Sequence, residues 1–310
     1  MLSKTSVILK GWLAFELNVL RRLKFNSIAI PFTGEANLGT YLKRWNVRIA
    51  ANDLLLWSWT SAVANIQNNH EIMTEGELNL VLEDAYVPRY RLQNQSLRNW
   101  FNETDSWWFD NVRQNIEKVS SPVVKAIALS LGMAIGDYVL SFDEETLELR
   151  QPLSTVYKRL WSSQLDPINN NQNNPCTNRI GYEFLAENYT DLMFLRLPRV
   201  NNLDLKNSLG FMAWREEWIR CNDSFWNELE ESQVGRLGTH VETKFQYLKL
   251  VEETLKTASH IPTWAISHVE DGFITTQDIV ETISKIRKVD SIFTKDFSEL
   301  TGTKAVIITA

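Results

Sequence analysis

The sequence has few cysteines, prolines and glycines, and each shortage excludes a class of protein. Two cysteines, Cys176 and Cys221, cannot form a disulfide framework or a four-cysteine zinc site. Only 12 glycines and 8 prolines interrupt 310 residues, which disfavours a many-turned β fold and favours long helices. No uninterrupted apolar run reaches the roughly 18 to 20 residues that span a bilayer, so we expect no membrane span.

Basic residues are also in the minority, and the formal net charge is -6. A general nucleic-acid binder needs a basic face, so we expect no nucleic-acid partner. The first 25 residues are an exception, because their only acid is Glu16. Lys10, Glu16 and Asn18 interrupt the apolar part of this stretch, which makes it a poor secretory signal. We expect a cytoplasmic protein with an amphipathic first helix, and organelle targeting by the basic N-terminus is the alternative.

Several familiar catalytic motifs are missing from the chain. It has no Gly-x-Gly-x-x-Gly, no Gly-x-x-x-x-Gly-Lys-Ser/Thr and no Gly-x-Ser-x-Gly. The four histidines are scattered and form no His-Glu-x-x-His pair: His70, His240, His260 and His268. These absences argue against a catalytic zinc and against a Ser-His triad.

Helical apolar patterns cover most of the chain. Residues 41–69 are apolar almost all round, which predicts one long helix buried in the core. Ser121 and Pro122 predict a helix start, with Ser121 as the cap and Pro122 at the first position. Further segments with a helical pattern are residues 8–25, 75–90, 97–119, 144–163, 182–195, 203–235, 239–259 and 275–289.

The remaining segments do not suggest a sheet. Residues 166–175 are so polar that we expect a surface loop. Residues 305–310 look β-like but are too short for a sheet by themselves, and we find no βαβ alternation. The sequence therefore predicts an all-α fold with a single domain over residues 1–310, in which residues 1–40 form an N-terminal extension and the first helix.

One polar stretch inside the helical pattern offers metal ligands. On a helix, Asp223, Asn227 and Glu231 fall at i, i+4 and i+8, so they share one face. Three oxygen-bearing side chains on one face suit a hard ion such as Mg²⁺. The alternative is a solvated acidic helix face.

The order of these parts resembles the class I terpene synthase (terpene cyclase) family. That family has a metal motif at the end of a long apolar helix, a diphosphate-sensing Arg before a helix break, and a second metal triad on a later helix. The resemblance implies that Arg179 senses diphosphate, that Gly181 marks the helix break, and that the triad holds Mg²⁺.

Two departures from that family bear on the expected reaction. No Asp-Asp-x-x-Asp occurs, and the uncharged Asn65 and Asn69 hold the corresponding places. Two neutral amides bind Mg²⁺ more weakly than two carboxylates. The Arg-Tyr pair that closes many microbial sites is also missing, and Arg89 or Lys285 are the substitutes for contacting diphosphate.

The resemblance implies an enzyme that uses Mg²⁺ to ionise a prenyl diphosphate and releases a terpene. A second hypothesis is a prenyltransferase that moves the prenyl group onto an amine such as an amino acid, like the algal N-prenyltransferases on the same fold. A third is a non-catalytic helical protein that has lost one metal motif. A homodimer is left open as the assembly.

Overall fold

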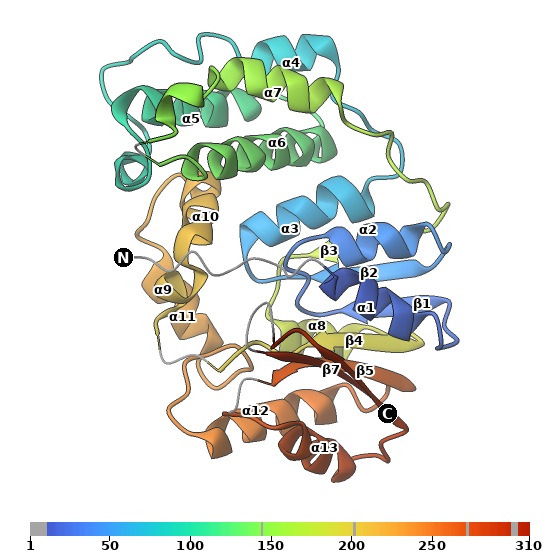
Figure 1. The fold of residues 1–310 in the computed structure, drawn as a ribbon. Helices are drawn as coiled ribbons and strands as arrows, with labels where there is room; N and C mark the ends of the chain where they lie inside the picture. The colour runs from blue at the N-terminus through green and yellow to red at the C-terminus, as the bar shows by residue number, and fades with distance from the viewer. Residues whose placement is uncertain (1–10, 144, 201–202, 271–272, 299–302) are drawn as a thin grey trace.

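The protein is built around a seven-stranded sheet with the order β3-β2-β1-β4-β5-β7-β6 (Figure 1). The computed structural model describes residues 11–143, 145–200, 203–270, 273–298 and 303–310. The strands are β1 (Ser27–Ile30), β2 (Arg48–Asn52), β3 (Cys176–Thr177), β4 (Leu192–Arg196), β5 (Thr263–Glu270), β6 (Ser291–Asp296) and β7 (Lys304–Thr309). β1 to β5 pair in parallel along this order, and β7 runs antiparallel to β5 and β6. The fold is α/β, so the all-α prediction is wrong.

The predicted long helix over residues 41–69 is also wrong. The helix α2 (Asn37–Lys43) ends early, and the chain turns at Asn46, whose φ of 61° lies in the left-handed region. β2 follows, and then the helix α3 (Leu56–Ala62), which continues as the π-helical turn η1 (Val63–Gln67). A buried strand of a parallel sheet is apolar on both faces, so its sequence does not alternate and reads like part of a buried helix.

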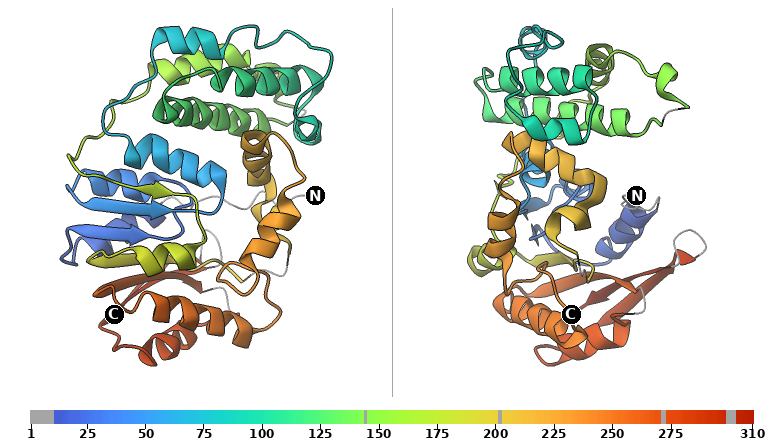
Figure 2. Two further views of the ribbon diagram at one scale, coloured as in Figure 1. Left: turned by 180° about the vertical axis from the view of Figure 1, so that it is seen from behind. Right: turned by 90° about the vertical axis from the view of Figure 1, so that its left-hand side faces the viewer.

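Helices cover both faces of the sheet (Figure 2). Ile28 and Ile30 of β1 belong to a core that includes α1 (Trp12–Leu20) and α2. Ala29 lies in the core on the opposite face, with residues of α8 (Gly181–Glu187), α12 (Lys244–Thr257) and α13 (Thr276–Ser284). β7 has the same arrangement, so residues 305–310 are strand as expected but join a sheet formed by distant segments.

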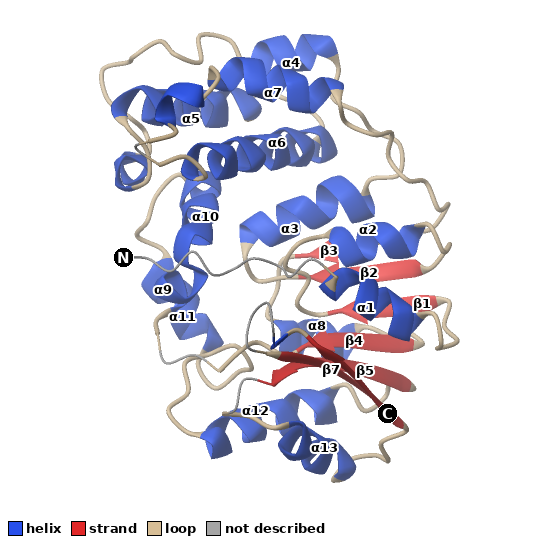
Figure 3. Cartoon of the chain, in the orientation of Figure 1, coloured by secondary structure: helices blue, strands red, loops and turns tan. Residues whose placement is uncertain are grey.

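A second hydrophobic core lies above the sheet, in a group of helices that we call the helical unit (Figure 3). It comprises α3, α4 (Glu75–Val81), α5 (Glu103–Ile116), α6 (Pro122–Leu140), α7 (Leu153–Ser162) and α10 (Ala213–Arg220). The short helices η2 (Gln95–Asn99), η3 (Leu147–Leu149), α9 (Leu205–Leu209), η4 (Gly210–Met212) and α11 (Trp226–Gln233) complete the described helices.

Helix α6 begins where the sequence predicts. The Ser121 hydroxyl accepts a hydrogen bond from Val124 N, and Pro122 occupies the first helical position. By length and composition, α6 is the one described helix that could cross a membrane. Half of its apolar window is buried, and it packs in the core of the helical unit. We therefore interpret α6 as a core helix.

The polar segment 166–175 contributes buried side chains. Asn170 and Asn174 are 4% and 1% exposed. The Asn174 Oδ1 accepts from Ile49 N, and the Asn170 Nδ2 donates to the Val47 carbonyl. These amides supply hydrogen bonds to the backbone beside β2, next to the short strand β3. Asparagine side chains can satisfy buried backbone groups without apolar surface.

A buried lysine makes the stability depend on pH. Lys43 on α2 is 1% exposed, and its Nζ donates to the Asn68 carbonyl. Burial lowers the pKa of Lys43 from 10.5 to about 8, so the folded state binds fewer protons than the unfolded state between these values. Burial raises the pKa of Cys176 from 9.0 to about 12, which has the opposite effect above pH 9. The net rise in stability with pH therefore falls between pH 8 and 9.

We expect the free energy of unfolding to rise through this window, by at most about 1.4 kcal/mol per pH unit. Urea unfolding at several pH values would measure it. Lys43→Met should remove the rise, whereas Lys158→Met, at an exposed position, should leave it unchanged. Equal slopes in the wild type and Lys43→Met would contradict the assignment.

Candidate ligand cleft

A cleft of about 1330 Å³ opens at the carboxyl ends of β1, β2 and β4. β1 has β2 on one side and β4 on the other, so the strand order reverses direction here. Open α/β sheets bind their ligands at such a switch point. The opposite wall comes from α6, α9, η4 and α10. We call this space the switch-point cleft.

The loop after β1 forms the floor of the cleft with its backbone. Gly34 has a φ of 56°, in the left-handed region that favours glycine. No atom lies within 4 Å of the position that a Cβ on Gly34 would take. Thr33 N donates to the Asn52 carbonyl, and Gly34 N donates to the Asp53 carboxylate at 2.9 Å. The loop is therefore fixed from beneath, while the space over Gly34 stays open.

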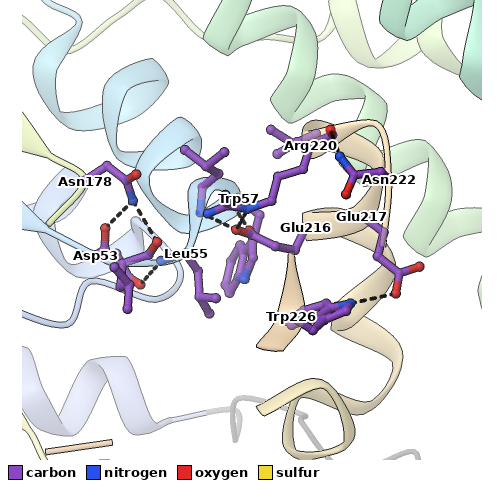
Figure 4. Close-up of polar contacts among 12 residues, drawn as sticks. Asp53, Leu55, Trp57, Asn178, Glu216, Glu217, Arg220, Asn222 and Trp226 are labelled. Carbon is purple, nitrogen blue, oxygen red and sulfur yellow. Dashed lines mark hydrogen bonds and ion pairs between the residues drawn. The ribbon is translucent and has the colours of Figure 1, made fainter. Parts of the chain in front are cut away.

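Asp53, directly after β2, is the acid closest to that loop, and its carboxylate is engaged by the chain itself (Figure 4). Its Oδ2 accepts from Gly34 N and from the Ser58 hydroxyl at 2.8 Å, and its Oδ1 accepts from Leu55 N at 3.0 Å. Burial raises the pKa of Asp53. An acid after the second strand binds the ribose in many dinucleotide sites. Here the same position ties the loop to the start of α3.

Arg196, the last residue of β4, closes the crevice between β1 and β4. Its Nε and Nη2 each donate to one oxygen of Glu16 at 2.8 Å, and its Nη1 donates to the Thr33 carbonyl at 2.9 Å. Glu16 is completely buried on α1, and it also accepts from Trp12 Nε1. A two-pronged Arg–carboxylate pair of this kind is strong and geometrically specific.

Arg215 of α10 connects the same loop to the helical unit. Its Nη1 donates to Glu35 at 2.8 Å, and its Nε donates to Asp137 of α6 at 3.2 Å. The guanidinium also lies 4.9 Å from the centre of the Trp57 ring. Both acids that face the cleft at this point are therefore paired with one arginine.

Two adjacent buried acids on α10 hold the helical unit in place (Figure 4). Glu216 accepts from Leu56 N and Trp57 N, each at 3.0 Å, so it caps the first turn of α3. Glu217 accepts from the indole nitrogens of Trp100 and Trp226. Sequence reasoning missed both acids, although their place between Trp214 and Trp218 was a signal of burial.

The predicted metal triad does not form. Asp223 lies in the turn before α11, whereas Asn227 and Glu231 lie on α11, and all three are exposed. Within the described ranges, no group of three His, Cys, Asp or Glu side chains could hold a metal ion. The Mg²⁺ prediction is therefore wrong.

The other predicted site residues each have a local partner outside the cleft. Asn65 donates to the Ser61 carbonyl and Asn69 to the Gln172 carbonyl, each at 2.9 Å. The remaining partners are Glu187 for Arg179, Gln114 for Arg89 and Glu252 for Lys285, and Gly181 packs against Phe32 at the start of α8. The structure does not bring these residues together around the cleft.

Comparison with known proteins places the chain elsewhere than the terpene synthases. No family model matches it. It is 21% identical over 302 residues to the type II methyltransferase M2.HphI of Haemophilus parahaemolyticus, and the match covers 89% of this chain and 86% of that protein. This similarity and the α/β sheet overturn the terpene synthase resemblance and both enzyme hypotheses built on it, as well as the non-catalytic helical protein. Both point to a Rossmann-like methyltransferase fold, and the similarity by itself suggests an enzyme.

Proposed function

We propose that this protein binds S-adenosylmethionine in the switch-point cleft and a nucleic acid beside it. The observation that carries the proposal is the cleft at the ends of β1, β2 and β4, in a chain similar to a type II methyltransferase over nearly its whole length. Such enzymes take the methyl group from S-adenosylmethionine and act on DNA. The similarity replaces the expected prenyl diphosphate and amine, and it overturns the expectation of no nucleic-acid partner.

The residues in the cleft fit the nucleoside part of this cofactor. Phe32, Leu54 and Leu55 supply apolar surface for an adenine ring. The open space over Gly34 lets a ligand approach the backbone. Arg199 is exposed at the end of the cleft and can meet a carboxylate. When bound, S-adenosylmethionine supplies an activated methyl group, and these side chains would bind and orient it.

A matched pair of glycine variants tests the binding. Gly34→Asn should weaken the affinity for S-adenosylmethionine roughly tenfold or more, because the new side chain enters the open space. Asparagine tolerates the left-handed backbone better than other residues, so the fold should persist. Gly235→Asn is the control, because Gly235 has a φ of 73°, equally open surroundings and no place in the cleft.

Isothermal titration calorimetry of both variants and the wild type would measure the effect. Equal affinities in the two variants would place the ligand elsewhere. A wild type that does not bind S-adenosylmethionine or S-adenosylhomocysteine would refute the proposal. Fluorescence anisotropy with a labelled DNA duplex at about 50 mM salt tests the second ligand, since such binding is strongest at low salt. No change in anisotropy would remove the nucleic acid from the proposal.

A further inference from the structure

The chain end of β4 contains no side chain that can accept a proton. Arg196, Leu197, Pro198 and Arg199 follow one another at this point. Leu197 is buried in the core beside α12, and the guanidinium groups of the two arginines only donate hydrogen bonds. A neutral amino group that receives a methyl group has to lose a proton, so a transfer site needs an acceptor beside it.

The acids near this point are already engaged. Glu16 is completely buried and is held by Arg196 through both of its oxygens. Asp53 accepts from two backbone amides and one hydroxyl. Glu35 and Asp137 share Arg215.

Arg196 also fills space that a reacting group would need. Its guanidinium reaches from the end of β4 to the Thr33 carbonyl after β1, and so it spans the crevice at the switch point. Moving it aside would leave Glu16 buried and charged without its partner, which is costly. The crevice is therefore closed by a pair that has a strong reason to stay in place.

From these contacts we propose that the switch-point cleft holds S-adenosylmethionine without transferring its methyl group to an amino group of a nucleic acid, because the Arg196–Glu16 pair occupies the reaction position. This inference rests on the proposed function, since it presumes that the cofactor binds. It departs from the enzymatic activity that the similarity to a methyltransferase suggests. The fold would then serve as a sensor or scaffold that recognises the cofactor and a nucleic acid.

Turnover is tested separately from binding. The full-length protein would be incubated with S-adenosylmethionine carrying a tritiated methyl group and with duplex DNA, single-stranded DNA or RNA. Mass spectrometry would follow S-adenosylhomocysteine, and scintillation counting would follow the nucleic acid. We expect calorimetric binding with no S-adenosylhomocysteine and no tritium above the level of Gly34→Asn. Methylated amino groups made by the wild type above that level would overturn the inference, whereas absence of binding would refute the proposed function instead.

A measurement without ligand tests the Arg196–Glu16 pair itself. Arg196→Met and Glu16→Met should each lower the melting temperature, because each leaves one buried charge without its partner. The double variant should melt well above the level expected from adding the two losses. The matched control is the exposed Arg179–Glu187 pair, for which the same substitutions should change little. Simple additivity at Arg196 and Glu16 would mean that no closing pair exists and would overturn the inference.

Discussion

Replacing Glu216 with glutamine is expected to destabilise the protein by about 3 to 5 kcal/mol, the range for breaking a buried ion pair. The Glu216 side chain is completely buried and makes three hydrogen bonds as an acceptor. Its Oε1 accepts from Leu56 N and from Arg220 Nε, and its Oε2 accepts from Trp57 N. A glutamine amide has one acceptor oxygen, so its NH₂ group would face at least one buried donor.

The consequence should reach beyond α10 itself. Glu216 caps α3, and α3 begins three residues after Asp53 at the edge of the cleft. Urea unfolding, followed by far-UV circular dichroism, would measure the loss. Glu231→Gln is the matched control, because Glu231 is exposed on α11, and it should change the stability by less than about 0.5 kcal/mol. Equal effects at the two positions would show that Glu216 does not cap α3.

Replacing Gly136 of α6 with alanine is expected to cost about 3 kcal/mol, at the upper end for an overpacked core. A Cβ on Gly136 would lie 2.1 Å from Cζ2 and 2.2 Å from Cη2 of the Trp214 indole. Trp214 is completely buried, and its ring packs against Phe101, Phe109 and Trp218, so the ring has little room to shift. α6 and α10 would have to separate, although alanine favours a helix more than glycine does.

Gly76→Ala provides the comparison within another helix of the same unit. The nearest atom to a Cβ at Gly76 is the Thr74 hydroxyl at 3.9 Å, so this variant should gain up to about 1 kcal/mol. Thermal melting and tryptophan fluorescence of both variants would separate the two outcomes. A gain of stability in Gly136→Ala would mean that α6 and α10 do not pack closely.

Local signals in the sequence were sufficient for several helices. Ser121 and Pro122 predicted the start of α6, and Thr275 with Asp278 caps α13 at the predicted place. Capping depends on residues within one turn of each other, so the sequence alone contains the relevant contacts. The low count of glycine and proline also agrees with the helices that cover the sheet.

The sheet was missed because its strands are short and their partners are distant in the chain. β1 has four residues and β2 has five, and their burial hides the alternation by which exposed strands are recognised. The similarity to the terpene synthases depended on the spacing of Asp223, Asn227 and Glu231. Spacing places residues on one face only if a single helix contains them, and the turn before α11 breaks that condition.

The sequence by itself determined the reach of the local contacts: where α6 and α13 begin, the shortage of cysteine, and the absence of the common catalytic motifs. Only the tertiary structure decided the rest. It aligned β1, β2 and β4 so that their ends form a cleft, and it brought Glu16 to Arg196 across 180 positions of the chain. The side-chain pair at that point depends on the register of a parallel sheet. Register is set by long-range packing, which no short stretch of sequence records.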